Sequence, residues 1–553
     1  MQIANSDDSE SFDFERSSGH HSVHGPSNIK PVDLKQFAQY SVDRQSAVSD
    51  WPSDRMQFIP GVTDLHLGGF YEILDRVVGK LLDVQSDQHI GSKAEFAYYA
   101  MTDTSNDHLA RATTQEIIFQ AGFDSEIHYV ESTDGYITEM IRIINPLADP
   151  SRLKQPPVAM YHGILGDTSL WVTSSTTQHH PEKWPRDIVA DGLMTSWNRS
   201  LGFVLANNGY DVWLVGTRGC NRSNQGHRTI YKPWSIYGDN LTVSDVMATL
   251  EYWQNFTIDD IGMNEVPGQL DRIMDLTGSP KISVVSYSVS TLTTLALLSE
   301  RPEYSRKIHN YVAMDIPMSE RNANNLAKIL YRTACQLDYF DGTLLLTETI
   351  LSQQFRDAVL AMAKSKTLRY TLFRWVVNLL AGPSTRFNTL WELNLIGHNF
   401  WPVGFKEVKH LCQILSSNRF HKFDYGFIEN HVRYGSHAPP DYDLSKVKPG
   451  DNWFIITSKN DPFSTPEDIE TLIRIVGKQP HRHLYLPDNN HIDMVYAVDT
   501  DIRVNLPILE FLNRFSHESD QYESSYRSDT NTDLDTDPSL GRLDRPDDRV
   551  WGF

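Results

Sequence analysis

Short apolar runs alternate with helical patterns along most of this 553-residue chain, and this alternation restricts the fold more than any other feature. The runs are "IHYVESTDGYITEMIRII", "PPVAMYHGIL", "YDVWLVGTRG", "KISVVSYS", "NYVAMDIP", "NWFIITSKND" and "HRHLYLP". Strands that alternate with helices indicate a mostly parallel sheet covered by helices. We therefore predict an α/β fold. A hairpin turn centred on Asp134 and Gly135 is expected to precede its parallel part.

The segments outside this alternation differ from it in composition. The two ends of the chain are polar and acidic with few aliphatic side chains, which predicts disorder. Another stretch, 318–420, is helical in pattern, unusually aromatic and free of strand signals, so we interpret it as an insertion. We predict six segments: 1–55 disordered, 56–112 a helical extension, 113–317 the first part of the core, 318–420 a helical cap, 421–515 the second part of the core, and 516–553 a disordered acidic tail.

Charge and cysteine content restrict the partners. The chain has 50 Lys and Arg against 71 Asp and Glu, a net charge of −21. An acidic chain without a basic cluster argues against nucleic acid as the main partner. Cys220, Cys335 and Cys412 lie far apart, which favours separate thiols over a disulfide framework or a zinc cluster. One long-range disulfide is the alternative, and the sequence predicts no oligomeric state.

The N-terminal region bears on location. It has neither a basic nor an apolar signal-peptide segment, and the chain has no run of about twenty apolar residues. We therefore expect a cytoplasmic protein or one peripheral to lipid surfaces, with a secreted or lysosomal location only if the N-terminus is incomplete. In residues 70–84 the apolar side chains share one helical face, which we expect to pack on the protein itself. The alternative is contact with a membrane or lipid-droplet surface.

The stretch "KISVVSYSVSTLTTLALLSE" predicts a strand, a sharp turn and a helix. A serine at such a turn is the nucleophile elbow, usually written G-x-S-x-G, because the flanking positions must be small where the two backbones approach. Here the pattern is S-Y-S-V-S, with Ser288 at the centre and Ser286 and Ser290 at the flanks. Serine is the next smallest choice after Gly and Ala, so we expect strained but feasible geometry. Leucine at position 290 should abolish activity through a steric clash.

A nucleophilic serine needs a general base and an acid that orients it, in the chain order Ser, acid, His. Asp461 follows the strand of "NWFIITSKND", and His491 follows the strand of "HLYLP". Asp468 is the competing acid, but Thr465, Pro466 and Asp468 fit the first positions of a helix, which gives Asp468 a structural role. The rival bases, His481 and His483, lie before that strand or at its start.

Two backbone N–H groups are needed for the oxyanion. One is expected from Val289, the residue after the nucleophile. The other is expected from Ile164 in "VAMYHGILGD", where Gly163 lets the backbone approach and His162 is structural. The alternative is an ordinary turn at the end of a strand.

Several blocks resemble the acid lipases of the α/β-hydrolase superfamily, the family of the gastric and lysosomal acid lipases. They are "YVESTDGYITEMIRI", "YHGILGDTSLWV", "LANNGYDVWLVGTRGCNRS", "RFHKFDYG", "VRYGSHAPPDYDLSKV", "NDPFSTPEDIETL" and "NNHIDMVYAVD", spread over roughly residues 112–515. The resemblance implies an α/β-hydrolase fold with a mostly parallel central sheet and a helical cap. It also implies Ser288 as nucleophile, Asp461 as acid, His491 as base, and Ile164 and Val289 at the oxyanion hole. The implied activity is hydrolysis of lipid esters, triacylglycerol or steryl ester, with no metal and no cofactor.

The chain also departs from the family pattern. The family's G-H-S-Q-G-T is Ser286-Tyr287-Ser288-Val289-Ser290-Thr291 here, and its Gly-Asn after the W-L strand is Gly216-Thr217. Because the elbow glycines are lost, a catalytically inactive lipid-binding or scaffold protein on the same fold is the alternative hypothesis.

Overall fold

The computed structural model describes residues 110, 112–174, 200–219, 224–227, 256–336, 359–360, 373–384, 386, 392–399 and 403–518. In these residues ten strands form one sheet, with the order β1-β2-β4-β3-β6-β7-β8-β9, β5 beside β2 and β10 beside β3. The strands are β1 (Asp124–Glu131), β2 (Tyr136–Ile144), β3 (Lys154–Tyr161), β4 (Tyr210–Val215), β5 (Asn224–His227), β6 (Ile282–Tyr287), β7 (Ile308–Met314), β8 (Asn452–Ser458), β9 (Arg482–Leu486) and β10 (His517–Glu518). The six strands from β4 to β9 in the sheet order are parallel, and the others pair antiparallel. The predicted α/β-hydrolase fold is confirmed.

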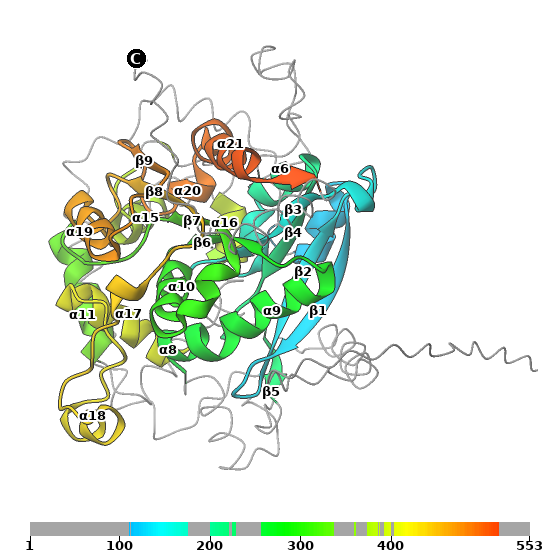
Figure 1. Ribbon diagram of the computed structural model, residues 1–553. Coiled ribbons are helices and arrows are strands. Elements are labelled where there is room, and N and C mark those ends of the chain that lie inside the picture. The colour runs from blue at the N-terminus through cyan, green and yellow to red at the C-terminus, as the bar shows by residue number, and fades with distance from the viewer. Residues whose placement is uncertain are drawn as a thin grey trace, which may run out of the picture.

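Helices cover both faces of this sheet (Figure 1). The α-helices of the described residues are α4 (Thr114–Gln120), α6 (Leu201–Asn207), α8 (Ile258–Asp260), α9 (Val266–Thr277), α10 (Val289–Glu300), α11 (Asn325–Gln336), α15 (Arg374–Ala381), α16 (Glu392–His398), α17 (Phe405–Ser417), α18 (Phe427–Tyr434), α19 (Pro466–Val476), α20 (Asp493–Tyr496) and α21 (Leu506–Phe515).

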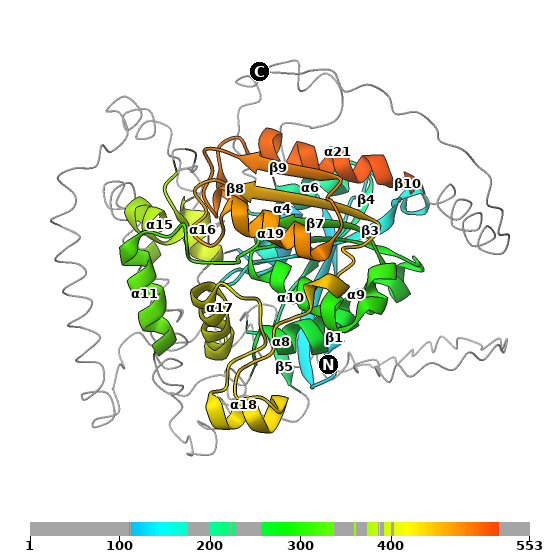
Figure 2. The ribbon, with the colours of Figure 1, turned by 60° about the vertical axis from the view of Figure 1, so that its left-hand side comes forward.

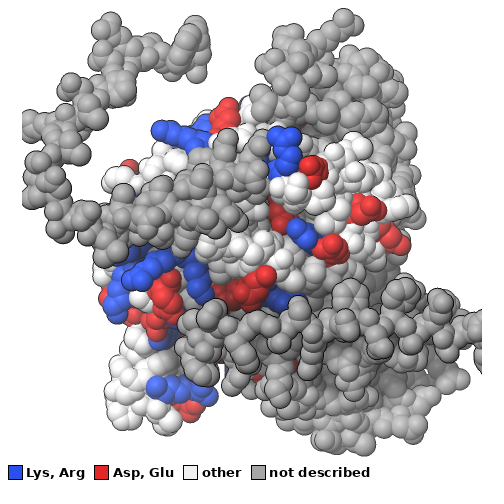
Figure 3. Space-filling model, turned by 45° about the vertical axis from the view of Figure 1, so that its right-hand side comes forward, with Lys and Arg blue, Asp and Glu red and all other residues white. Residues whose placement is uncertain are grey.

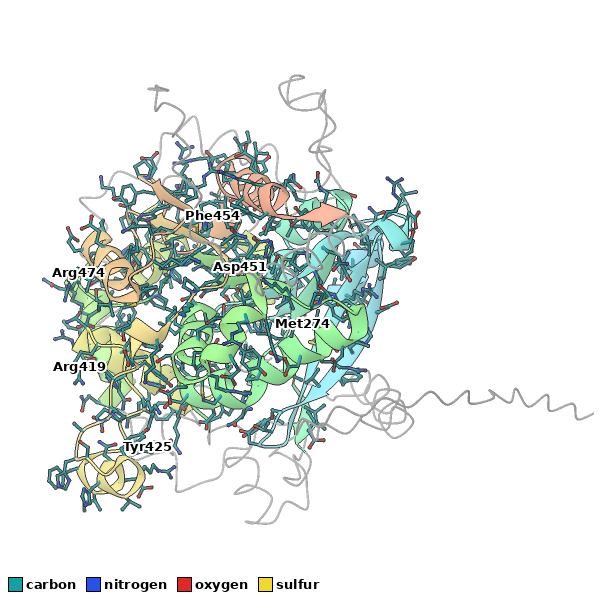
Figure 4. All side chains as sticks on the ribbon, in the orientation of Figure 1. Met274, Arg419, Tyr425, Asp451, Phe454 and Arg474 are labelled. Atoms are coloured by element: carbon teal, nitrogen blue, oxygen red, sulfur yellow. The ribbon has the colours of Figure 1, made fainter. Side chains whose placement is uncertain are left out.

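Two hydrophobic cores result, one on each face. Along β4, Val212 and Leu214 face the core that contains α6 and α21, whereas Trp213 and Val215 face the core that contains α9, α10 and α19. Phe454 on β8 belongs to the first core and Met274 on α9 to the second (Figure 4). Strands buried on both faces are apolar at nearly every position. This explains why the sequence shows continuous apolar runs instead of alternating ones.

The predicted hairpin turn joins β1 to β2. The Ser132 N–H donates to the Tyr136 carbonyl (2.7 Å), and Gly135 has φ 99°, which favours glycine. The position of this turn is therefore confirmed. At the other end of the core, β10 pairs with Lys154 and Gln155 of β3, so the sheet extends past the predicted boundary at residue 515. The polar sequence of His517–Glu518 gave no strand signal, because this strand is held by backbone pairing.

Helices fill the described part of the chain between β7 and β8. Figure 2 shows α11, α15 and α17 together on one side of the sheet. The boundaries of the cap at 318 and 420 stay predictions, and the described residues of that range contain no strand. The segments 1–55 and 70–84 lie outside the described residues. In the described part of the chain, no helix is long and apolar enough to cross a bilayer.

The described surface is mixed in charge. On the face shown in Figure 3, acidic and basic side chains lie intermixed, and neither sign forms an extended patch there.

Helix α18 lies apart from the core at one end of the molecule (Figures 1 and 2). It exposes Phe427, Ile428 and Val432, with exposed fractions of 67%, 77% and 73%.

Candidate active site

Ser288 lies in the sharp turn between β6 and α10. Its backbone has φ 58° and ψ −126°, a conformation that a non-glycine residue adopts only when its surroundings hold it. Tyr287 is the last residue of β6 and Val289 the first of α10. A strand that turns directly into a helix places the side chain of Ser288 at the end of the sheet. The strand–turn–helix predicted from the sequence is therefore present.

The two flanking serines are bonded to this turn. Ser290 Oγ accepts the N–H of Tyr287 (2.9 Å) and lies within donating distance of the carbonyls of Tyr287 (2.9 Å) and Tyr161 (3.1 Å). Ser286 Oγ lies 3.0 Å from Thr294 Oγ1. Both serines are buried. Position 290 therefore holds a hydroxyl that stabilises the turn, which the argument from residue size alone did not predict.

The three predicted triad residues lie in one chain of hydrogen bonds. His491 Nε2 lies 2.8 Å from Ser288 Oγ, and His491 Nδ1 lies 3.0 Å from Asp461 Oδ2. All three side chains are buried. The second carboxylate oxygen of Asp461 accepts the N–H of Phe463 (2.8 Å), which fixes the carboxylate. With Nδ1–H donated to Asp461, His491 presents Nε2 as the acceptor for the hydroxyl proton of Ser288.

Aromatic rings and backbone bonds fix the imidazole of His491. Tyr287 stacks on it with ring centroids 5.3 Å apart, and Phe463 meets it edge-on at 4.8 Å. The hydroxyl of Tyr287 donates to the His491 carbonyl (2.8 Å), and the N–H of His491 donates to the carbonyl of Ala381 at the end of α15 (3.1 Å). His491 is thus positioned by the end of β6 and by the end of α15.

Gly382 and Arg386 also contact the segments around His491 and Asp461. Asn490 Nδ2 donates to the carbonyl of Gly382 (2.7 Å), and Val498 N–H donates to the carbonyl of Arg386 (2.9 Å). Gly382 has φ 91°, and a Cβ there would lie 1.8 Å from the carbonyl oxygen of Asn460, beside Asp461. Only glycine fits this contact.

The competing acid and bases have structural roles. Asp468 forms a capping box with Thr465 at the start of α19, as the sequence predicted. His481 Nδ1 accepts the N–H of Trp453 (3.2 Å), and His483 Nε2 lies 3.0 Å from Thr457 Oγ1. Burial lowers the pKa of both histidines. Neither histidine is bonded to Ser288, so the geometry favours His491 as the base.

The predicted oxyanion loop approaches the nucleophile closely. A Cβ on Gly163 would lie 3.0 Å from Ser288 Cβ, so the missing side chain is what allows this approach. Ile164 and Val289 both line a cavity of about 20 Å³ beside the turn, which has room for about one water molecule. The N–H of Val289 belongs to the first turn of α10, and the N–H groups at the start of a helix favour a negative charge nearby.

His162 supports this loop. Its Nδ1 lies 2.8 Å from the Gly163 carbonyl, and its Nε2 accepts the N–H of Thr217 (3.3 Å). Burial lowers the pKa of His162, which favours the neutral ring. The ring links the predicted oxyanion loop to the segment that follows β4. The structural role expected for His162 agrees with these bonds.

Sequence patterns did not predict a buried network of charged residues that lies beside the predicted oxyanion loop. Arg218 is fully buried and binds Glu265 (Nε to Oε2, 2.8 Å) and both oxygens of Asp134 (2.6 and 2.7 Å), with Tyr136 stacked on the guanidinium at 4.1 Å. Burial alone would lower the pKa of Arg218, but the charge of Glu265 and the bonds to Asp134 outweigh it and raise that pKa. The carboxylates are distant in sequence, so no local pattern could predict the network.

The cavity also holds an unusual carboxyl group. Glu407 lies in the first turn of α17, is buried and lines the same cavity as Arg218. Burial, followed by the charge of Glu265, raises the pKa of Glu407 to about 8. Glu407 is therefore mostly protonated at neutral pH.

A second aspartate lies beside the triad and was also missed. Asp315 is fully buried, and one of its carboxylate oxygens, one of Asp461 and a ring nitrogen of His491 lie within 4.8 Å of one another. Such a set is compact enough to surround a cation. Both ring nitrogens of His491 already have partners, Ser288 and Asp461. We therefore assign His491 and Asp461 to the predicted triad and not to a metal site.

Comparisons with known proteins show which proteins this chain resembles. The family model of the partial α/β-hydrolase lipase region matches residues 114–175, which include the first hairpin and the oxyanion loop. Lipase 1 of Drosophila melanogaster is 26% identical over 463 residues, which cover 81% of this chain and 93% of the relative. Gastric triacylglycerol lipase of Bos taurus is 26% identical over 413 residues, with coverages of 73% and 91%. This chain is therefore similar to lipases over most of its length, which supports its place among the acid lipases of the α/β-hydrolase superfamily.

Further matches are also lipases or ester hydrolases by name. Lipase member N of Homo sapiens is 25% identical over 419 residues, which cover 73% of this chain and 91% of the relative. Among solved structures, an acetylester hydrolase from Corynebacterium glutamicum covers 71% of this chain and 96% of its own, with 12% identity and a TM-score of 0.38. The fold assignment depends on the sheet order and not on that likeness. The expected cytoplasmic location gains no support from the structure or from the relatives.

Proposed function

We propose that this acid lipase family member is a serine hydrolase that cleaves carboxylic ester bonds of lipids through an acyl-enzyme on Ser288. The observation that carries the proposal is the continuous chain of hydrogen bonds from Ser288 through His491 to Asp461. Each of the three residues follows a different strand of one sheet, so the fold itself brings them together.

The reaction follows from these positions. Ser288 Oγ attacks the ester carbonyl carbon while His491 Nε2 takes the hydroxyl proton, and Asp461 stabilises the imidazolium. The N–H groups of Ile164 and Val289 bind the oxyanion. When the tetrahedral intermediate collapses, His491 returns the proton to the leaving alcohol. Water then attacks the acyl-enzyme, with His491 as the base again, and the carboxylic acid leaves.

The proposed substrates are triacylglycerols or steryl esters. The names of the relatives support lipid esters in general, and one of them is a gastric triacylglycerol lipase. The helical cap between β7 and β8 is the proposed source of the apolar surface for the acyl chains. The inactive-protein alternative rested on the lost elbow glycines. The hydrogen bonds of Ser286 and Ser290 weaken it, because serine fits both positions.

A fluorophosphonate probe tests the proposal. The purified chain is treated with the probe between acidic and neutral pH, and the adduct is located by mass spectrometry. We expect an adduct on Ser288 and its absence in Ser288→Ala. Emulsions of triacylglycerol and of cholesteryl ester then identify the substrate, with released fatty acid as the readout. A folded protein that gives no adduct at any pH, or a Ser288→Ala variant that hydrolyses esters at the wild-type rate, would refute the proposal.

The two aspartates of the β8–α19 region provide a matched test of the acid. Asp461→Asn should lower the labelling rate strongly, whereas Asp468→Asn should change stability and not labelling. Circular dichroism verifies that both variants are folded. Equal labelling by the two variants would contradict the role of Asp461.

A further inference from the structure

We propose that Asp315 is a second acid of this site, a positioning residue that acts on His491 beside Asp461 and takes over part of its role when Asp461 is replaced. The inference rests on the proposed serine-hydrolase function. It gives a role to a residue that has none in the reaction described above.

The sheet order brings the two aspartates together. Asp315 directly follows β7, and Asp461 lies in the loop after β8. These strands are parallel neighbours, with Met314 paired to Ile456, so their carboxyl ends meet at one edge of the sheet. The backbone of Asp315 is held there by a bond from its N–H to the Ile456 carbonyl (2.9 Å) and has φ 45°. The strained backbone aims this residue towards the triad instead of continuing the strand.

Each carboxylate has separate support. Ser458, the last residue of β8, donates its N–H to Asp315 Oδ1 (2.8 Å) and its hydroxyl to Asp315 Oδ2 (3.1 Å). Asp461 instead accepts the N–H of Phe463 in its own loop (2.8 Å). Because the two sets of bonds share no donor, a change at Asp461 leaves Asp315 in place, within reach of the imidazole.

The charges around Asp315 decide which carboxyl carries the negative charge. The groups that face it are Asp461, Asp493, His491 and the hydroxyl of Tyr287. Two carboxylates this close in a buried site do not both ionise at neutral pH. Burial, and then the charge of Asp461, raise the pKa of Asp315 well above its ordinary range, so Asp315 is the carboxyl group that keeps its proton.

Replacement of Asp461 by Asn reverses this situation. The charge that kept the proton on Asp315 is gone, so Asp315 releases its proton to solvent at a lower pH. The resulting carboxylate lies within 4.8 Å of a nitrogen of His491, in the buried environment where a charge acts most strongly. It can therefore stabilise the imidazolium, though less well than a directly bonded carboxylate. We expect residual activity in this variant that depends on Asp315 and that increases with pH.

The test is a set of variants labelled with the fluorophosphonate probe. Loss of the acid of a serine triad lowers the rate by about 10⁴-fold in a trypsin-like protease. With Asp315 in place, Asp461→Asn should lose on the order of 10- to 100-fold, and the double variant Asp461→Asn/Asp315→Asn should fall to about 10⁴-fold below wild type. Asparagine still offers an oxygen to the Ser458 N–H, so the fold should persist, and melting curves verify it. If that double variant does not fold, Asp315→Ser in the same background replaces it.

The pH profile and a control separate positioning from structure. The labelling rate of Asp461→Asn should rise with pH as Asp315 ionises, and that rise should be absent from the double variant. The control is Asp461→Asn/Asp468→Asn, which also removes a second buried carboxylate and should label no more slowly than Asp461→Asn. Equal rates for Asp461→Asn and Asp461→Asn/Asp315→Asn, or an equal loss in the control, would overturn the inference. An unlabelled wild-type protein would instead refute the proposed function.

Discussion

The hydroxyl of Ser290 provides the sharpest test of how this elbow is stabilised without its usual glycines. Oγ of Ser290 can accept one bond, from the N–H of Tyr287, and donate one, to the carbonyl of Tyr287 or Tyr161. Ser290→Ala thus removes two buried hydrogen bonds, each of which contributes about 0.5–1.5 kcal/mol. We expect a loss of about 1–3 kcal/mol in the free energy of unfolding.

Ser286→Ala is the matched control. It also deletes a buried hydroxyl, which lies 3.0 Å from Thr294 Oγ1 and also interacts with the hydroxyl of Tyr311, but which donates nothing to the backbone of the turn. The hydroxyl of Thr294 still donates to the Ser290 carbonyl (2.9 Å) in this variant. The expected loss is about 0.5–1.5 kcal/mol. Urea unfolding followed by tryptophan fluorescence measures both variants. The strained backbone of Ser288 depends on the Ser290 bonds, so labelling of Ser288 should slow on the order of tenfold in Ser290→Ala, equal to about 1.4 kcal/mol.

Two outcomes would refute this reasoning. If Ser286→Ala is destabilised as much as Ser290→Ala, the bonds to the turn have no special role. If Ser290→Ala is as stable and as reactive as wild type, serine at this position is only a small residue, as the sequence argument assumed. Ser290→Leu should be inactive in either case, because it places a large side chain at a buried position between β6 and α10.

Three further predictions concern the surroundings of the site. Arg218→Met should lower the free energy of unfolding by about 3–5 kcal/mol, because it leaves a buried glutamate without its partner, and urea unfolding measures the loss. Gly382→Ala should abolish labelling of Ser288, since the added Cβ would overlap the carbonyl oxygen of Asn460. The control Gly435→Ala places its Cβ in open space, so it should label normally and lower the free energy of unfolding by only about 1–2 kcal/mol. The pKa of Glu407 is raised to about 8 in the folded protein. The side chain therefore stabilises the fold at pH values below the unfolded pKa, and this stabilisation is lost as the pH rises through 8. Relative to Glu407→Gln, the wild type should therefore lose up to about 5 kcal/mol between pH 4 and pH 9, and equal slopes of stability against pH would contradict this assignment.

The sequence predicted the candidate residues that lie just after the ends of strands. Ser288, Asp461 and His491 each follow an apolar run, and parallel strands bring such positions to one edge whatever lies between them. The same rule could have drawn attention to Asp315, which directly follows the run "NYVAM". What the sequence lacks is the order of the strands, since only the adjacency of β7 and β8 places Asp315 beside Asp461.

Contacts between distant segments could not be predicted. Hydrophobicity patterns predict that charged residues lie on the surface of the protein. Arg218 and Glu265 are 47 positions apart, so nothing in the sequence indicated that they form a buried pair. The bonds of Ser290 were equally hidden, because size rules describe where a side chain fits and not which atoms its hydroxyl meets. The two serines that departed from the family motif were a reason to doubt catalysis, and in the structure they are part of the turn.

The contacts of residues 381–386 have a consequence for how such an enzyme can diversify. Helical insertions above a conserved sheet are often regarded as interchangeable parts that tune specificity. Here the carbonyls of Ala381 and Gly382 bind the histidine loop, and Gly382 lies against the loop of Asp461. A chimaera that exchanged the whole insertion with a relative would also exchange the support of His491. We therefore expect that an exchange must keep Ala381 and Gly382 together with the loops of His491 and Asp461, and that only the rest of the insertion is free to vary.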